Sequence, residues 1–241
     1  IIRRMAEIDC ANVDDYYQSV SGTVSGAPEW IRLIDNIVVR ETRFFRDPAS
    51  FEYLSLYLKA AVGKRKNTKP LELWSVGCAS GEEAYGMAMV AADAITSLGG
   101  NQLFGVTATD ISRNALACAS KGTYRKRALS HLDEKTRNTY FYNVDTRNMK
   151  VVDAIKQRVC FSYHNLLSVE AAPTQQVDAI FCQNVLPYFR PALAEKVLDE
   201  LVERLTPGGL MIVGHSETGR WSNNKVQRLS DRTINAYRRN K

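Results

Sequence analysis

The stretch WSVGCASGEEAYGMAM, residues 74–89, decides the fold class of this chain. An apolar run ends at a loop that contains Gly77 and Gly81, and a pattern of helical period begins at Glu82 and Glu83. A strand, a glycine-containing loop and a helix in this order open the nucleotide site of many α/β proteins. Carboxylates beside the loop repel a phosphate and attract a cation. A second interpretation is structural, because acids in a first turn stabilise the helix dipole.

The loop lacks the two common phosphate-binding patterns. A Walker loop reads G-x-x-x-x-G-K-[ST], and this loop has no lysine. A dinucleotide loop reads G-x-G-x-x-G, which is also absent. S-adenosylmethionine carries a ribose, an ammonium group and a sulfonium, but no phosphate. It therefore fits the charges of the loop better than NAD or ATP.

Outward from this stretch, strand-like and helix-like segments alternate, with short loops between them. This alternation predicts an α/β fold built on a doubly wound, mostly parallel sheet. We expect strands at 71–76, 103–110, 178–185 and 208–217, helices at 82–98, 112–121 and 191–205, and a polar edge strand at 231–239. Asp110 ends the second strand, where an acid typically accepts hydrogen bonds from ribose hydroxyls.

Two regions lie outside this alternation. Residues 140–163 hold short β-like pieces at 150–152 and 158–163, which predict a small antiparallel excursion. Ahead of the sheet, apolar spacing predicts helices over residues 1–20, around 30–38 and at about 48–62. The last begins at Asp47-Pro48, since proline is favoured at a first helical position. Its expected buried face is Phe51, Leu54, Leu58 and Val62.

Composition sets broad limits. The net charge is +6 and the pI is about 9.1, which favours an acidic partner and leaves nucleic acid, an acidic protein surface and an anionic membrane open. No apolar stretch reaches the roughly 18–20 residues of a membrane span. The five cysteines form no C-x-x-C pair, and Cys78, Cys160 and Cys182 read as small buried residues of strands, so we expect a reducing cytosol.

Five strings, in order, resemble one protein family. They are RETRFFRDPASF (40–51), WSVGCASGEEAYGMAM (74–89), TATDISRNALACASKGTY (107–124), FSYHNLL (161–167) with FCQNVLPYF (181–189), and VGHSE (213–217). Together they closely resemble the chemotaxis receptor methyltransferases of bacteria, from about Val38 to Arg238. The resemblance implies methyl transfer from S-adenosylmethionine to glutamate side chains on the helical cytoplasmic domain of a receptor.

The resemblance also implies roles for single residues. Arg46 and Tyr188 would lie at the transfer site, Glu82 at the methionine end of the cofactor and Asp110 at the ribose. The full set of cofactor-binding positions is Arg40, Thr42, Arg46, Gly77, Glu82, Asp110, Asn165 and Leu166 at the adenine, and Gln183, Asn184 and Val185 beneath the cofactor. Two structural interpretations compete: core packing for Phe44, Phe45 and Phe189, and an ion pair of Arg46 with Asp47. The three histidines, His131, His164 and His215, are not at ligand spacing, and we expect no metal.

Three positions depart from the family pattern. Arg40 stands where the family has Asn, Gln183 stands in place of Arg, and Pro187 stiffens the approach to Tyr188. These changes suggest a divergent paralogue, such as the methyltransferase of a type IV pilus or surface-motility system. Residues 140–163 lack the glycines of tether-binding relatives, so we expect no need for a receptor pentapeptide tether.

The resemblance divides the chain into a remnant of an N-terminal helical domain, 1–35, and a methyltransferase domain, 36–241. It implies a cytoplasmic monomer that neither enters a membrane nor binds nucleic acid. One alternative is a non-catalytic module that binds S-adenosylmethionine or another nucleotide. Another is a nucleic-acid methyltransferase, which is disfavoured because NVLPYF (184–189) lacks the second proline of an Asp/Asn-Pro-Pro-aromatic string.

Overall fold

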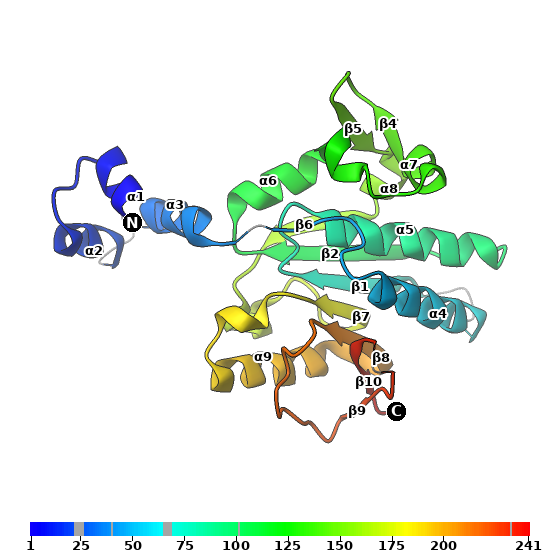
Figure 1. The fold of residues 1–241 in the computed structure, drawn as a ribbon. Helices are drawn as coiled ribbons and strands as arrows, with labels where there is room; N and C mark the ends of the chain where they lie inside the picture. Colours follow the sequence, from blue (N-terminus) through cyan, green and yellow to red (C-terminus); the bar gives the residue numbers. More distant parts are fainter. Residues whose placement is uncertain (22–26, 40, 65–68, 101, 232) are drawn as a thin grey trace.

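The computed structural model describes residues 1–21, 27–39, 41–64, 69–100, 102–231 and 233–241, and its centre is a seven-stranded sheet (Figure 1). The strand order is β6-β2-β1-β7-β8-β10-β9. The first five strands are parallel, and β10 and β9 add antiparallel pairs. The strands are β1 (Leu71–Val76), β2 (Phe104–Asp110), β6 (Val159–Tyr163), β7 (Val177–Cys182), β8 (Leu205–Val213), β9 (Val226–Arg228) and β10 (Asn235–Arg239). The predicted doubly wound α/β sheet is confirmed.

Alternate residues of β1 face two different hydrophobic cores. Leu71 and Leu73 pack into the core that includes α4 and α5, while Trp74 and Val76 pack into the core under α9. Because both faces are covered, the strand reads as a continuous apolar run. The helices of this body are α4 (Pro48–Lys64), α5 (Glu82–Ser97), α6 (Arg113–Lys121) and α9 (Pro191–Arg204). All four residues predicted for the inner face of α4 are buried.

The chain adds β2 and β6 on one side of β1 and then adds β7 and β8 on its other side. The direction in which strands are added therefore reverses at β1. In an open α/β sheet, ligands bind at this switch point, beyond the carboxyl ends of the strands. The loops after β1, β2 and β7 therefore meet at one place.

The N-terminal residues are helical, as predicted, and form three short helices with a break within residues 1–20. They are α1 (Ile2–Glu7), α2 (Val13–Ser21) and α3 (Ala27–Ile37). The break follows from Asp9, whose φ of 58° ends α1, and from Asn12, whose Oδ1 accepts the amide of Asp15 at 2.8 Å. Arg4 pairs with Glu29 at 2.5 Å in a buried site between α1 and α3. These helices stand beside the sheet, and α3 reaches toward α6 (Figure 1).

A small antiparallel sheet, in the order β3-β5-β4, projects from the body beyond α5 and α6 (Figure 1). Residues 158–163, expected in this excursion, instead form β6 at the edge of the main sheet. That edge position leaves Cys160 exposed, which corrects its expected burial. The small sheet instead takes in 123–125. Its strands are β3 (Thr123–Arg125), β4 (Phe141–Asn143) and β5 (Asn148–Val151), with α7 (Glu134–Tyr140) and α8 (Asp153–Lys156) beside them.

The edge on the other side of the main sheet also differs from the prediction. β10 lies between β8 and β9, so it is an inner strand, and the three-residue β9 forms the edge. Its buried Asn235, Ala236 and Tyr237 agree with that position. Among the described residues, no helix combines the length and the apolar character of a membrane span.

Candidate functional site

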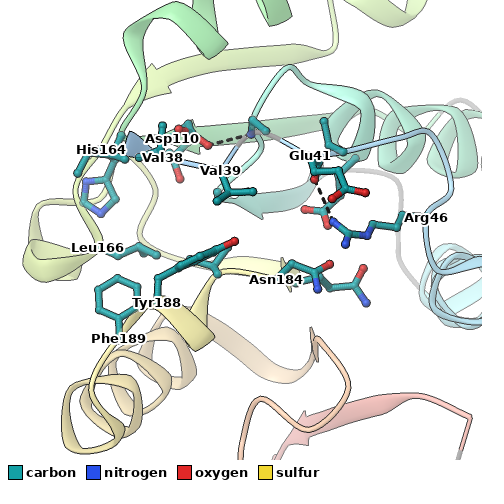
Figure 2. Close-up of a pocket in the computed structure, with 18 of the residues that line it drawn as sticks. Val38, Val39, Glu41, Arg46, Asp110, His164, Leu166, Asn184, Tyr188 and Phe189 are labelled. Carbon is teal, nitrogen blue, oxygen red and sulfur yellow. Dashed lines mark hydrogen bonds between the residues drawn. The ribbon is translucent and has the colours of Figure 1, made fainter. Parts of the chain in front are cut away.

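A cavity of about 460 Å³ lies at the switch point of the sheet (Figure 2). Its volume is in the range typical of small-molecule sites. It is lined by the loops after β1, β2, β6 and β7, by the end of α3 and by the 41–46 segment. Of the predicted site residues, the lining includes Thr42, Arg46, Gly77, Asp110, Asn165, Leu166, Gln183, Asn184, Val185 and Tyr188. Arg40 lies outside the described residues.

Both the backbone angle at residue 77 and the space around it require a glycine. Its φ is +71°, in the left-handed region that favours glycine. A Cβ atom there would overlap the Cγ2 atom of Val185, which comes from the loop after β7. The two loops therefore approach one another closely beneath the cavity, and they do so only because residue 77 has no side chain.

Asp110 is held by the backbone around it. One carboxylate oxygen accepts the amide of Ala79 at 2.8 Å and the other accepts the amide of Ser112 at 2.7 Å. Burial raises the pKa of Asp110, and these amide hydrogen bonds act in the opposite direction. The carboxylate lines the cavity and keeps further lone pairs for a ligand hydroxyl.

The structure places Glu83 at the cavity, while Glu82 is not among the residues that line it. Glu82 is buried, and its Oε2 accepts the Ser80 hydroxyl at 2.7 Å. Glu83 accepts the Ser75 hydroxyl at 2.7 Å. Burial raises the pKa of Glu83 to about 7; the Ser75 hydrogen bond lowers it, the Glu217 charge raises it and the Arg46 charge lowers it. Sequence alone does not separate two adjacent acids at a helix start, because which one faces the site depends on the helix phase.

The loop after β7 takes an unusual backbone conformation. Asn184 has a φ of 61°, and its amide donates to Glu217 at 2.6 Å. Gln183 donates from Nε2 to Asp47 at 3.2 Å and to Ser50 at 3.1 Å, so its side chain joins this loop to the start of α4. Glu217, in the VGHSE string, thus holds the backbone of the loop after β7 in place. The sequence does not indicate this role.

The 41–46 segment brings Thr42 and Arg46 to the cavity. Phe44 is fully buried against Tyr124 and Phe141 of the small sheet, at ring distances of 4.9 and 5.1 Å, as core packing predicts. Arg46 donates to the carbonyl oxygen of Glu41 at 2.9 Å.

The competing structural interpretation of Arg46, an ion pair with Asp47, is wrong, because no such pair forms between these two described residues. The Asp47 carboxylate instead accepts the Ser50 hydroxyl at 2.6 Å. Phe45 packs against Phe51, at a ring distance of 4.9 Å, as core packing predicts. Phe189 packs against the core under α9 and also lines the cavity.

Tyr188 reaches into the cavity from 3-10 helix η4 (Leu186–Tyr188) (Figure 2). It is 66% exposed, so its ring is held in the open site and not in the core. A second cavity of about 120 Å³ adjoins the first, and the two share Val39, Glu41, Arg46, Asn184 and Tyr188. Pro187 lines the second cavity but not the first.

The end of α3 closes the remaining side of the cavity, which the sequence analysis did not predict. Ile34, Ile37, Val38 and Val39 line it. Asp35 fastens α3 to the body, because its Oδ1 accepts the Ser112 hydroxyl at 2.5 Å. Ser112 is itself the N-cap of α6. The amphipathic pattern of residues 27–37, directly before the RETRFF string, could have indicated that this helix packs beside the site.

The described lining fits S-adenosylmethionine by its chemistry. Glu83 and Asp110 offer carboxylates to an ammonium group and to ribose hydroxyls, while Leu166 and the α3 residues give apolar surface for adenine. The glycine loop gives space without phosphate-binding lysine. The fold and this cavity define a class I methyltransferase that uses S-adenosylmethionine.

Comparison with known proteins identifies the family. The model of "CheR methyltransferase, SAM binding domain" matches residues 40–235, and the chain therefore belongs to the CheR methyltransferase family. A chemotaxis protein methyltransferase of Vibrio parahaemolyticus is 34% identical over 86% of this chain and 75% of its own length. A probable biofilm formation methyltransferase, WspC, of Pseudomonas putida is 30% identical over 89% of this chain and 49% of its own length.

A solved structure of the plantazolicin methyltransferase BpumL with S-adenosylhomocysteine has a TM-score of 0.41 and 16% identity. It covers 81% of this chain and 55% of its own. The family assignment and the cofactor that the sequence predicts are thus confirmed by the family model.

Proposed function

We propose that this chain methylates glutamate side chains of a chemotaxis-type receptor, forming methyl esters on its cytoplasmic helical domain. The observation that carries the proposal is the smaller cavity, which opens beside the cofactor-sized one. Arg46 and Tyr188 lie where the two cavities meet. A guanidinium and a phenol at this point suit an acceptor carboxylate, since arginine binds carboxylates by charge-assisted hydrogen bonds.

The proposed cofactor contacts follow the two loops. Asp110 would accept from the ribose hydroxyls, Asn165 and Leu166 would flank the adenine, and Glu83 would pair with the methionine ammonium. Glu83 replaces Glu82 in this role because Glu83 lines the cavity. Bound there, S-adenosylmethionine would supply a methyl group on a sulfonium to the acceptor carboxylate oxygen, and the carbon–sulfur bond would break to leave S-adenosylhomocysteine.

The residues at the meeting point would align the acceptor. A glutamate with a pKa of about 4.3 is already a carboxylate near pH 7, so no general base is needed. The protein must then supply alignment and exclude water. Arg46 would orient the acceptor carboxylate, and Tyr188 would help to hold it where the two cavities meet. The apolar end of α3 would keep water from the methyl group.

Tether independence belongs to the same proposal. The connection between β4 and β5 is short, with the Val144 amide bonded to the Asn148 carbonyl at 3.1 Å. Asp145 accepts the amides of Arg147 and Asn148, at 2.7 and 2.8 Å, which tightens the turn. Low-micromolar binding of a receptor C-terminal pentapeptide in calorimetry would contradict this part.

Transfer of a labelled methyl group to a receptor signalling domain tests the proposal. We expect label that is released as methanol by base, since an ester is base-labile and an N-methyl group is not. Calorimetry with S-adenosylmethionine should be run beside it. Binding without transfer to any receptor domain would favour the non-catalytic module instead.

A further inference from the structure

The turn that follows β8 brings one carboxylate to the loop after β7, which lines the larger cavity. The backbone of this turn reverses sharply, since the Glu217 amide bonds to the Gly214 carbonyl at 3.2 Å and Ser216 has a φ of 62°. The Glu217 side chain folds back over Gly214, and a Cβ atom at residue 214 would overlap its carboxylate. Only a glycine at this position leaves room for the carboxylate.

Strand β10 holds the turn in place. The side-chain amide of Asn235 donates from Nδ2 to the Gly214 carbonyl at 3.1 Å and to the Thr218 hydroxyl at 3.2 Å. The Tyr237 hydroxyl donates to the same Thr218 oxygen at 3.0 Å. The side chains of Asn235, Tyr237 and Thr218 are buried. Because residues on both sides of Glu217 are bonded to an inner strand of the main sheet, its carboxylate has a rigid support.

The loop after β7 presents backbone amides to this carboxylate. Asn184 has a φ of 61°, and Val185 follows it with a φ of −113° and a ψ of −47°. A left-handed residue followed by a right-handed one turns successive amides to the same side, which makes a concavity for an anion. Oε1 of Glu217 accepts the Asn184 amide at 2.6 Å. Burial raises the pKa of Glu217, and hydrogen bonds from the backbone of Asn184, Gly214, Leu186 and Val185 lower it.

The same loop residues form the turn that presents Tyr188. The Tyr188 amide bonds to the Val185 carbonyl at 3.3 Å, and the Phe189 amide bonds to the Leu186 carbonyl at 3.0 Å. Asn184 and Tyr188 line both cavities. Since the Tyr188 ring is largely exposed, its direction depends on the backbone beneath it more than on packing in the core.

Glu217 also acts on Glu83 through its charge. Burial is the main cause that raises the pKa of Glu83 to about 7; the Glu217 charge raises it further and the Arg46 charge lowers it. The thiols of Cys78 and Cys182 also lie near Glu83, and burial raises the pKa of both, so they stay neutral. The charge of Glu217 therefore has an effect at Glu83 that is separate from its hydrogen bonds to the loop.

We propose that Glu217 is a positioning residue for methyl transfer, whose carboxylate fixes the backbone that directs Asn184 and Tyr188 into the cavities and whose charge acts on Glu83. This role rests on the proposed function, in which Tyr188 helps to hold the acceptor carboxylate. Glu217 is not among the described residues that line either cavity. It therefore acts through the loop and through Glu83, without contact to the substrate.

Variants of two residues separate the reach of the carboxylate from its charge. Glu217→Asp keeps the charge and withdraws the carboxylate by one carbon–carbon bond, about 1.5 Å. Glu217→Gln keeps the reach and one acceptor oxygen but removes the charge. Gly214→Ala keeps Glu217 and displaces its carboxylate. Glu195→Gln is the matched control for the change of charge, since Glu195 is exposed on α9.

We expect Glu217→Asp and Gly214→Ala to lower the turnover number about tenfold, with little change in the KM for a receptor domain. Glu217→Gln should lose less, about threefold, because a neutral acceptor still reaches the Asn184 amide but makes a weaker hydrogen bond. Amide hydrogen exchange at 184–186 should be faster in Glu217→Asp and Gly214→Ala than in Glu195→Gln. Affinity for S-adenosylmethionine at pH 7.5 should stay within about threefold in every variant, which shows that they fold.

The pH dependence of cofactor binding should change with the charge and not with the reach. Without the Glu217 charge the pKa of Glu83 falls, so Glu217→Gln should keep its affinity for S-adenosylmethionine to a lower pH than the unchanged chain does. Calorimetry between pH 6 and 7.5 measures this shift. Glu217→Asp and Glu195→Gln should retain the original profile. A purely structural role for Glu217 would not separate these two substitutions.

Three results would overturn the proposal. They are unchanged exchange at 184–186 in Glu217→Asp, faster exchange there with an unchanged turnover number, and the same pH profile in Glu217→Gln as in Glu195→Gln. If the unchanged chain transfers no methyl group to a receptor domain, the proposed function fails. The exchange rates and pH profiles, which need no acceptor, then decide the role of Glu217 by themselves.

Discussion

At the scale of single residues, a substitution of Tyr188 should affect turnover and leave cofactor binding almost unchanged. Its ring is largely exposed at the junction of the two cavities, so little of the fold depends on it. We expect Tyr188→Phe to lower the turnover number about tenfold, the size of one lost hydrogen bond to a charged group. Cofactor affinity by calorimetry should remain almost unchanged. An equal loss of both would rule out the proposed role.

Glu83 should make cofactor binding depend on pH. Its pKa is raised to about 7, so the carboxylate that attracts an ammonium forms only as the pH rises through that value. Affinity for S-adenosylmethionine should therefore be up to about tenfold weaker at pH 6 than at pH 7.5. This window lies below the pH of about 8 at which the ligand's own amino group loses its charge.

Two variants identify the group responsible for this dependence. Glu83→Gln should bind the cofactor weakly and with a flat profile between these pH values. Glu82→Gln is the matched control, because Glu82 is adjacent in sequence and also has a raised pKa, caused by burial, but bonds to Ser80. A flat profile in Glu82→Gln, with the dependence kept in Glu83→Gln, would return the role to Glu82.

Gly77 permits a test in which backbone strain and side-chain contact are separated. Gly77→Ala adds both a strained left-handed alanine and an overlap with Val185, while Gly99→Ala adds only the strain, since Gly99 has a φ of +63° and open space around it. Strain alone costs roughly 1–2 kcal/mol. We expect Gly77→Ala to lose clearly more unfolding free energy than Gly99→Ala and to bind the cofactor more weakly. Val185→Ala in the same chain should restore part of both losses.

At the scale of elements, the end of α3 forms one wall of the larger cavity, where we propose that the cofactor binds. The Asp35–Ser112 hydrogen bond joins it to the start of α6. Asp35→Ala leaves the buried Ser112 hydroxyl without this acceptor, which costs about 1–3 kcal/mol and loosens α3 from the body. The dissociation rate of S-adenosylmethionine should therefore rise several-fold. Asp14→Ala, at an exposed position of α2, is the control. Stopped-flow displacement that finds the same rate in both variants would contradict this role of α3.

Elements with a strong local pattern were predicted correctly from the sequence. β1 was expected at 71–76 and occupies Leu71–Val76, since both its faces are buried and it reads as one apolar run. The helix start at Pro48 was also correct, because Asp47 and proline fix it locally. The positions of β6 and β10 were not predicted, because they depend on pairing with β2 and β8, which no local pattern encodes.

The sequence also predicted some of the residues that line the cavity and not others. Gly77, Asp110 and Asn184 lie at strand ends, and the order of strands brings strand ends together. Glu83, Glu217 and the end of α3 were missed as site residues. Their roles depend on helix phase, on the path of a distant loop and on the packing of a separate helix. Those are properties of tertiary structure.

At the scale of the whole molecule, the hydrophobic cores show which parts unfold together. One core joins α4, α5 and the main sheet to residues of the small sheet, among them Phe141 and Val151. The N-terminal helices have a separate small cluster of Tyr16, Val20 and Leu33, with Met5 and Cys10 at its margin. The main and small sheets should therefore unfold as one unit, and α1 with α2 should open independently of it.

Amide hydrogen exchange should show this division directly. We expect fast exchange in α1 and α2, because short helices depend on packing and this cluster is small. The amides of β1 and α5 should exchange most slowly, since they lie within the main core. Adding S-adenosylmethionine should slow exchange at Ile34, Ile37, Val38 and Val39, which line the cavity, more than in α1 and α2. Equal protection of α1, α2 and α5 without cofactor would mean that the N-terminal helices are a cooperative part of the methyltransferase body.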